Sequence, residues 1–316
     1  MPENVTRLAP SPTGALHLGN ARTFLVNYLL ARRRGWRVRM RVEDLDGPRV
    51  RPGAEAEMLE TLRWLGLGWD GEIVRQAARG PTYAAALRRL IDMGAAYPCT
   101  CSRKDIATAA SAPHAEDGVA AYPGTCRGRF ASAEQAAAET HRPVAWRVRV
   151  DDADVTVEDR FAGRRTFNLA RTCGDFVVFK NDGLAAYQLA VTVDDAAGGV
   201  DAVVRGDDLL ESAARQRRLR ELLGLSPEPA YWHLPLVVGP DGRRLAKRHG
   251  DTRLHRYRRA GAPPQRVLGL LGYWSGLLEG RRETDMAGLL ERFDLYRLPA
   301  GPVVFTAEDD RFLLGE

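Results

Sequence analysis

The chain has 316 residues, of which 45% are hydrophobic and 28% charged, with a formal net charge of +5 and a pI of about 9.2. This composition is typical of a globular protein of more than one domain, and it excludes a membrane span because no run of about 18 apolar residues occurs. We expect a cytoplasmic protein, since no basic stretch with an apolar core opens the chain, and the basic excess favours an anionic partner such as nucleic acid.

The opening of the chain predicts the first unit of a parallel α/β sheet. Residues 5–8 form a strand pattern that ends at Ala9-Pro10-Ser11-Pro12-Thr13-Gly14, where prolines and a glycine break regular structure. A helical pattern follows at 20–33, Gly35 ends it, and residues 37–42 alternate in the manner of a strand. Strand, turn, helix and strand in this order are typical of α/β proteins.

The rest of the chain predicts more helices, a small insert and further strands. Helical patterns at 53–65 and 81–93 precede a segment at 97–130 that holds three cysteines together with prolines and glycines. The elements expected beyond it are strand-like pieces at 145–150 and 176–179, a tight turn at Asn181-Asp182-Gly183, apolar pieces at 188–193 and 202–204, a helix at 209–223, a strand at 233–238 and several short helices.

Polar groups gather in the first turn between strand and helix. Arg7 lies at the end of the strand, and His17-Leu18-Gly19-Asn20 opens the helix. A helix N-terminus offers free N–H groups and a positive dipole end to phosphate, a histidine adds a donor, and a glycine admits an adenine ring close to the backbone. On these residues alone, phosphate binding and a merely structural turn both stay open.

Acidic side chains follow the second strand, in the run Val42-Glu43-Asp44-Leu45-Asp46. Carboxylates at a strand end suit a metal ion, and a single carboxylate equally suits a buried cation in a pocket. Arg7 and Arg205 supply fork-shaped donors for carboxylates, and Tyr187 adds a hydroxyl.

A basic loop follows the last predicted strand, in the run Arg243-Arg244-Leu245-Ala246-Lys247-Arg248-His249. Lys247 is one of only three lysines in a chain where arginine supplies nearly all the positive charge. An ammonium group on such a loop can follow charge that develops on phosphates. The plainer interpretation is a solvated basic loop or an RNA contact.

Three of the four cysteines, Cys99, Cys101 and Cys126, lie within 28 residues of one another. In a cytoplasmic chain such a cluster favours a metal over disulfides, and zinc takes four ligands, usually thiolate or imidazole. On chemistry alone, His114 completes a set of three cysteines and one histidine.

Taken together, these motifs resemble class I aminoacyl-tRNA synthetases in their glutamyl form, over nearly the full length of the chain. The run from Arg7 to Gly14, with His17, is similar to the glutamyl form of the His-Ile-Gly-His signature, and Asn20 replaces its last histidine. The loop Arg244-Leu245-Ala246-Lys247 resembles the Lys-Met-Ser-Lys-Ser loop, with the first lysine and the serine replaced and the second lysine kept.

The resemblance implies roles for individual residues. L-Glutamate is expected at Arg7, Ala9, Ser11, Glu43, Tyr187 and Arg205, with Glu43 facing the substrate ammonium. ATP with Mg²⁺ is expected at His17, Gly19 and Lys247, of which His17 and Lys247 are the catalytic residues.

Two further motifs resemble the glutamyl-queuosine subfamily. The first is Glu43-Asp44-Leu45-Asp46 followed by Gly47-Pro48-Arg49, and the second is the spacing Cys-x-Cys…Tyr-x-x-x-Cys. The second motif implies a structural zinc ion held by Cys99, Cys101, Tyr122 and Cys126, with His114 as the alternative to Tyr122.

The expected architecture is an α/β class I synthetase fold with a Rossmann-type parallel sheet, a zinc-binding insert and a C-terminal helical extension. An anticodon-binding domain is not expected, because the chain stops about 70 residues after the Lys247 loop. Residues 1–96 are expected to form the first half of the catalytic domain, 97–185 the insert with the zinc site and an acceptor-binding-like region, 186–240 the second half, and 241–316 the Lys247 loop and a helical stem-contact-like region.

The implied reaction activates L-glutamate with ATP to glutamyl-adenylate and transfers it to queuosine at the first anticodon position of tRNA-Asp. We expect a monomeric enzyme. Two alternatives stay open: a minimal glutamyl-tRNA synthetase that charges the 3′ end of tRNA-Glu, and a non-catalytic RNA-binding paralogue. The substitutions at Asn20, Arg244 and Ala246 keep the paralogue open, and the intact set of Arg7, His17, Glu43, Tyr187, Arg205 and Lys247 counts against it.

Overall fold

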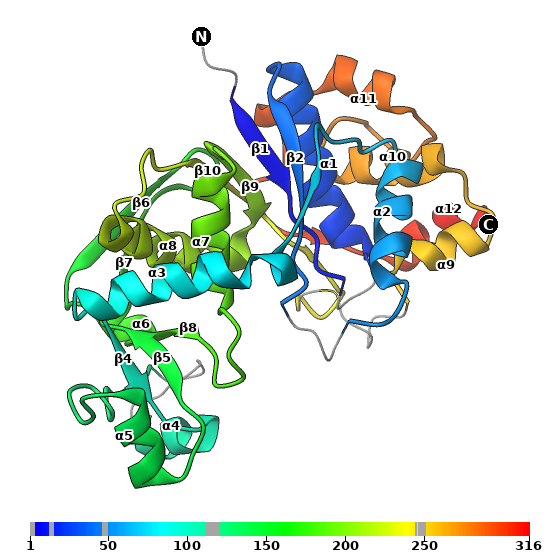
Figure 1. The fold of residues 1–316 in the computed structure, drawn as a ribbon. Coiled ribbons are helices and arrows are strands. Elements are labelled where there is room, and N and C mark those ends of the chain that lie inside the picture. The colour runs from blue at the N-terminus through cyan, green and yellow to red at the C-terminus, as the bar shows by residue number, and fades with distance from the viewer. Residues whose placement is uncertain (1–3, 13–15, 46–49, 111–120, 244, 246–250) are drawn as a thin grey trace.

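The computed structural model describes residues 4–12, 16–45, 50–110, 121–243, 245 and 251–316, with the backbone alone at 107–110 (Figure 1). Lys247, His114 and the run 46–49 lie outside the described residues. Predictions that fall on them therefore stay predictions from the sequence.

The predicted strand–turn–helix–strand opening is confirmed. Its elements, with those that extend it, are β1 (Val5–Leu8), α1 (Leu18–Arg33), β2 (Arg37–Val42), α2 (Ala54–Trp64) and β3 (Ile73–Arg75). Strands β1 and β2 pair in parallel, with Val5 opposite Arg37, and β3 pairs with β2 in the same sense. Gly35 follows the helix with a φ of 67°, a left-handed conformation that glycine adopts without strain.

A second parallel unit lies beside β1. It consists of β9 (Ala202–Gly206), the short η3 (Asp207–Leu209), α8 (Leu210–Leu223) and β10 (Ala230–Leu234). The backbone N–H of Asp201 donates to the Val5 carbonyl at 3.1 Å, so β9 begins next to β1. The chain order therefore jumps between these two neighbouring strands, and parallel sheets bind ligands at the carboxyl ends of strands at such a switch point.

The predicted strand at 233–238 is wrong in its extent. Strand β10 ends at Leu234, and a separate strand β11 (Val237–Val238) pairs with β12 (Val303–Val304). Pro235 lies between β10 and β11, and a proline has no N–H with which to continue a ladder.

A hairpin that the sequence analysis did not foresee extends the same sheet. Strands β6 (Asp154–Asp159) and β7 (Gly163–Asn168) are antiparallel, and β6 pairs in parallel with β10, which gives the order β7-β6-β10-β9. These residues fall within the segment 97–185 that is expected to be an insert. The boundaries of that segment stay a prediction, and its hairpin belongs to the catalytic-type sheet.

Other described residues of that segment form a tip, which consists of residues 96–110, 121–148 and 176–179. Its antiparallel sheet has the order β4-β5-β8, from β4 (Ala96–Cys99), β5 (Ala145–Val148) and β8 (Phe176–Phe179). The helices nearby are α4 (Arg103–Ala110), α5 (Ala133–Thr140) and α6 (Leu169–Thr172). Figure 1 shows α4 and α5 at the end of the molecule that is far from β1 and β2.

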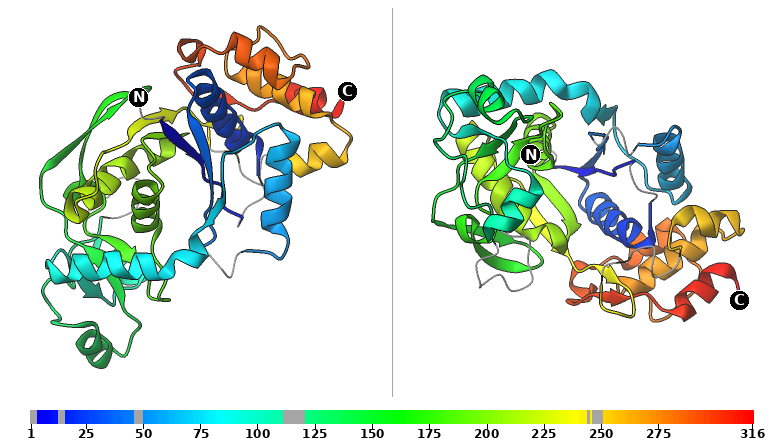
Figure 2. Two further views of the ribbon diagram at one scale, coloured as in Figure 1. Left: turned by 45° about the horizontal axis from the view of Figure 1, so that its top comes forward. Right: turned by 90° about the horizontal axis from the view of Figure 1, so that it is seen from below.

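Helices flank the central strands on both sides. Figures 1 and 2 show α3 (Gly80–Asp92), α7 (Tyr187–Ala197) and α8 on one side of β1 and β2, and the C-terminal helices on the other. The C-terminal helices are α9 (Leu254–Arg259), α10 (Pro264–Trp274), α11 (Met286–Arg292) and α12 (Ala307–Leu314). Their buried side chains join those of β1, β2 and α1 in one hydrophobic core. Within the described part of the chain, no helix is both long and apolar enough to cross a bilayer.

Gly269 allows helix α10 to touch the chain segment that follows it. A Cβ atom built at Gly269 would lie 1.8 Å from the carbonyl oxygen of Arg282, where no flexible side chain can give way. We expect Gly269→Ala to lower the free energy of unfolding by about 1–3 kcal/mol or more, as for other overpacked interiors. Urea unfolding measures this change. Gly280→Ala is the matched control, since a Cβ there meets nothing within 4 Å, and an equal effect of both variants would contradict the prediction.

Candidate active site and metal centre

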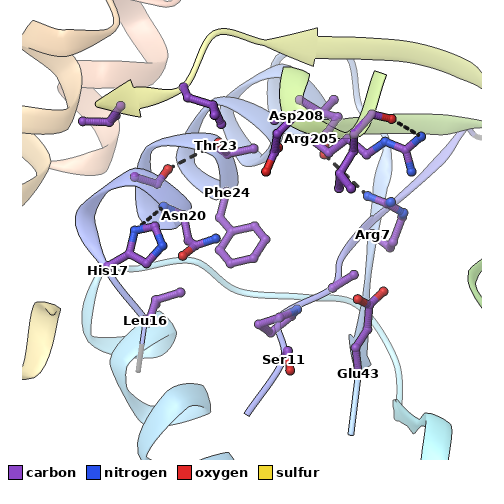
Figure 3. A pocket seen from close by; sticks show the side chains of 18 of the residues that line it. Arg7, Ser11, Leu16, His17, Asn20, Thr23, Phe24, Glu43, Arg205 and Asp208 are labelled. Carbon is purple, nitrogen blue, oxygen red and sulfur yellow. Dashed lines mark hydrogen bonds between the residues drawn. The ribbon is translucent and has the colours of Figure 1, made fainter. Parts of the chain in front are cut away.

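A cavity of about 460 Å³ opens at the carboxyl ends of β1 and β9 (Figure 3). It lies at the switch point of the sheet, where the turn after β1, the start of α1 and the loop after β9 converge. The residues singled out from the sequence that line it are Arg7, Ala9, Ser11, His17, Gly19, Asn20, Glu43, Tyr187 and Arg205. The structure thus brings together every described residue that the sequence places in the glutamate and ATP sites.

His17 is the N-cap of helix α1. Its Nδ1 accepts a hydrogen bond from the Asn20 backbone N–H at 3.3 Å, so in the neutral ring the proton is on Nε2, which remains a donor. A Cβ at Gly19 would lie 3.2 Å from two atoms of the His17 ring. Glycine at this position therefore gives the imidazole room to lie over the first turn of the helix.

Described residues in and after the predicted phosphate loop are anchored beside His17. Within the first part of the loop, Leu245 is buried and its N–H donates to the Val237 carbonyl at 3.4 Å. After it, the Thr252 carbonyl accepts from the Leu18 N–H at 3.1 Å, and the backbone of His17 forms a bridge with Arg253. Lys247 itself lies outside the described residues, and its role stays a prediction.

A buried ionic network supports one wall of the cavity. The Asp195 carboxylate on α7 lies 3.3 Å from the Arg7 Nε and is also paired with the guanidinium of Arg41. Arg41 in turn donates from Nη2 to Glu43 Oε1 at 3.1 Å. Burial would raise the pKa of Asp195, but Arg41 and Arg7 outweigh that effect and lower this pKa below its usual value. Asp195 is therefore an anion that aligns two cations behind the cavity.

A second buried chain of hydrogen bonds holds Arg205. Its Nε donates to His233 Nε2 at 2.9 Å, its Nη1 donates to Gln216 at 2.9 Å, and its Nη2 donates to the Leu209 carbonyl at 3.3 Å. Because His233 Nε2 accepts, the ring proton must lie on Nδ1, which then donates to Asp159 Oδ2 at 2.6 Å. Burial lowers the pKa of His233, and the neighbouring Arg205 lowers it further, so the ring is neutral near neutral pH.

Each nitrogen of Arg205 is anchored once, and a guanidinium has five N–H donors. Among the described residues the other two N–H groups have no hydrogen-bond acceptor, so they can donate to a ligand in the cavity that Arg205 lines.

Sequence reasoning did not find the residues that hold these site residues in place, namely Arg41, Asp195, Asp159 and His233. Arg41 lies on the opposite face of its strand from the apolar residues and looks like a solvated residue, yet it is buried. One signal was present for Asp195: two adjacent acids close an otherwise apolar helix, and acids are almost never fully buried unless they are paired.

The three clustered cysteines converge in the tip. The thiols of Cys99, Cys101 and Cys126 lie within 4.8 Å of one another, the only such group among the residues that the structure describes. The Tyr122 hydroxyl lies 3.4 Å from Cys99 Sγ and 3.7 Å from Cys101 Sγ, and the sulfurs of Cys101 and Cys126 are 3.5 Å apart. Tetrahedral zinc, with bonds of about 2.3 Å to sulfur and about 2.0 Å to oxygen, needs separations of roughly 3.8 and 3.5 Å. The four side chains therefore fit a zinc ion.

The other two candidates stand apart from this group. Cys173 donates to the Leu169 carbonyl at 3.4 Å and is not among the clustered thiols. His114 lies outside the described residues, so Tyr122 has structural support as the fourth ligand and His114 stays a prediction.

Comparisons with known proteins agree with this geometry. A family model described as "tRNA synthetases class I (E and Q), catalytic domain" matches residues 3–309. The chain is similar to the glutamyl-Q tRNA(Asp) synthetase of Rhodopirellula baltica, with 43% identity covering 96% of this chain and 97% of that protein. It is also similar to the protein of the same name from Nocardia farcinica, with 49% identity covering 95% and 92%.

Among solved structures, the chain is similar to the glutamate-tRNA synthetase from Elizabethkingia anophelis. The TM-score is 0.82 at 27% identity, and the match covers 98% of this chain and 70% of that one. A glutamate tRNA ligase from Elizabethkingia meningosepticum, solved in complex with its amino acid, matches with a TM-score of 0.81.

Proposed function

This chain belongs to the class I tRNA synthetases of the glutamate and glutamine group, and from that premise we propose that it activates L-glutamate with ATP and transfers it to queuosine in tRNA-Asp. As a member of this family it is an enzyme of the ligase type. The names of the relatives that match at 43% and 49% identity over nearly their whole length support the acceptor.

One observation carries the proposal for the amino acid. The charged side chains that line the cavity are two arginines, Arg7 and Arg205, and two carboxylates, Glu43 and Asp208. Glutamate has two carboxylates and one ammonium, so the two arginines and Glu43 complement its charges, and Asp208 is left for the rest of the ligand. Arginine forks bind carboxylates through two parallel hydrogen bonds, and a buried carboxylate is the natural partner of an ammonium. Ser11 and Tyr187 add hydroxyls at the same wall.

In the first step, a carboxylate oxygen of glutamate attacks the α-phosphorus of ATP, and the bond to the bridging oxygen of pyrophosphate breaks. Mg²⁺ enters with ATP and neutralises phosphate charge. His17 Nε2–H and the N-terminal end of α1 face the nucleotide, while Arg7, Glu43 and Arg205 fix the amino acid in line. The protein contributes mainly position and electrostatic stabilisation.

In the second step, a hydroxyl on the cyclopentene ring of queuosine attacks the glutamyl carbonyl carbon. An ester forms, the bond from that carbon to the phosphate oxygen breaks, and AMP leaves with the hydroxyl proton. We propose that arginines of the tip and of the C-terminal helices bind RNA phosphates.

We also propose that a structural zinc ion is bound by Cys99, Cys101, Cys126 and Tyr122. Their mutual distances support this site, as does the burial of Cys99, Tyr122 and Cys126. Bound there, the ion would tie β4 to the Tyr122 segment and so order the tip, without taking part in the chemistry.

The proposal predicts transfer of labelled glutamate from ATP and glutamate to queuosine-containing tRNA-Asp, and to neither unmodified tRNA-Asp nor tRNA-Glu. The physical reason is that only the modified base offers the ring hydroxyl. Acid-precipitable label on each RNA measures the transfer, with omission of ATP as the control.

Two outcomes would overturn parts of the proposal. Transfer to the 3′ end of tRNA-Glu would identify a minimal glutamyl-tRNA synthetase, the alternative favoured by the likeness to the Elizabethkingia structures. Absence of glutamate-dependent ATP–pyrophosphate exchange, with and without RNA, would leave a non-catalytic RNA-binding paralogue.

A further inference from the structure

A buried arginine lies against the cysteine cluster from outside it. Arg147, on β5, donates from Nε to Cys99 Sγ at 3.2 Å and from Nη1 to the Asp175 carbonyl at 2.6 Å. Its Cζ lies 3.8 Å from the centroid of the Tyr122 ring, close enough for a cation–π contact. One guanidinium therefore touches two of the four proposed metal ligands at once.

Arg147 carries a buried positive charge that no ion pair among the described residues balances. Only 7% of the residue is exposed, and among the described residues no carboxylate forms an ion pair with it. The nearby carboxylate of Asp175 is already bound by Arg127 and by the Tyr97 hydroxyl. A buried cation without a counter-charge is strongly unfavourable, so the cluster itself must supply that charge.

The proposed ligand set has the required sign. Three thiolates around a divalent zinc ion leave one net negative charge with a neutral Tyr122 phenol and two with a phenolate. An N–H group that donates to a ligating sulfur both disperses that charge and fixes the sulfur. Cys99 is the sulfur that Arg147 reaches.

We infer that Arg147 positions Cys99 and Tyr122 for metal binding and balances the charge of the metal site from outside the coordination sphere. The inference rests on the zinc site proposed above. The planar guanidinium suits the task because it donates in two directions along its edge and presents a flat face to the ring, which a lysine ammonium cannot do.

The chain offers a matched control in Arg149, two residues along. Arg149 also lies over a tyrosine, with its Cζ 5.1 Å from the Tyr97 ring, and its Nε donates to the Gly94 carbonyl at 3.1 Å. It is the same residue type and also has one carbonyl contact and one tyrosine contact, but it is more exposed than Arg147 and touches none of the proposed metal ligands.

The experiment compares Arg147→Gln, Arg147→Lys and Arg149→Gln with the unchanged full-length chain. Each protein is stripped of metal and titrated with Co²⁺, whose thiolate charge-transfer absorption reports sulfur coordination. Zn²⁺ affinity then follows from competition with a chelator of known affinity. We expect Arg147→Gln to weaken zinc binding by about 10- to 100-fold, the usual effect of losing a group that supports a metal ligand. Arg147→Lys should restore only part of the affinity, and Arg149→Gln should match the unchanged chain.

The outcomes separate this inference from the proposals on which it rests. Unchanged zinc affinity in Arg147→Gln, or an equal loss in Arg149→Gln, would overturn it while the metal site stands. Failure of the unchanged chain to bind either ion would overturn both.

If Arg147→Gln does not fold, the zinc affinity of Arg147→Lys tests the inference instead. Full affinity in that variant would refute the need for a planar guanidinium. Glutamate-dependent pyrophosphate exchange, measured in parallel, tests the proposed reaction separately, because no residue of the cluster lines the cavity.

Discussion

Asp195→Asn is expected to lower the free energy of unfolding by about 3–5 kcal/mol, the usual cost of removing one partner of a buried ion pair. Asp195 is 3% exposed and is the shared counter-ion of Arg7 and Arg41. Asparagine has nearly the same shape, so no cavity forms, while the change removes the negative charge and replaces one acceptor oxygen with an N–H donor. The buried guanidinium groups of Arg7 and Arg41 would then lie close together, and Glu43 would still pair with Arg41.

Urea unfolding followed by tryptophan fluorescence measures this loss, with Asp92→Asn on the exposed face of α3 as the control. The control should change the free energy of unfolding by less than about 0.5 kcal/mol. If the two variants were equally stable, Asp195 would not be the anion that holds this wall of the cavity together, and the network would have to be balanced by Glu43 alone.

Arg205→Lys is expected to reduce kcat/KM for glutamate activation roughly 30- to 1,000-fold. That range corresponds to about 2–4 kcal/mol, the usual cost of losing one partner of a buried, hydrogen-bonded charge pair. Lysine keeps the positive charge, but it cannot donate to His233, Gln216 and a substrate carboxylate in fixed directions. The ammonium would also be held less firmly, because the contact that His233 makes with Arg205 Nε would be lost.

Pyrophosphate exchange at varied glutamate and varied ATP separates this effect from general misfolding. The KM for glutamate should rise while the KM for ATP stays close to its original value, and Arg88→Lys on the exposed face of α3 should change neither. If only the KM for ATP rose, Arg205 would contact the nucleotide and would not belong to the glutamate site.

Local sequence patterns predicted the elements that carry the cavity because local chemistry determines them. A short apolar run followed by prolines and a glycine ends a strand, and a helical pattern that follows this turn places His17 at the start of a helix. Those two facts place Arg7 and His17 at one edge of a parallel sheet without knowledge of any other part of the chain. The structure confirms that placement.

The residues behind the cavity could not be predicted in this way, because their partners are distant in sequence. Asp195 meets Arg7 across 188 positions, and His233 meets Asp159 across 74. Only the pairing of strands and the packing of α7 bring these groups together. A contact between residues so far apart leaves no periodic pattern in the sequence, so the residues around each partner do not predict it.

Helix α7 and the β6–β7 hairpin show the same limit in secondary structure. Val191-Thr192-Val193 is a β-branched run with strand propensity, yet it is helical, because tertiary burial outweighs propensity. In β7, Arg164 and Arg165 are exposed and give no alternation of apolar and polar residues. Strand β7 therefore forms because it pairs with β6, and its own sequence pattern does not predict it.

The position of the β6–β7 hairpin limits how far this enzyme can be shortened. The hairpin lies within the segment that would otherwise be the obvious part to delete, yet β6 covers the edge of β10 and supplies the aspartate that orients His233. A deletion of 97–185 would uncover that edge, and unpaired strand edges recruit other chains. We therefore expect a shortened chain to stay folded better when Asp154–Asp159 is retained and only the tip is removed.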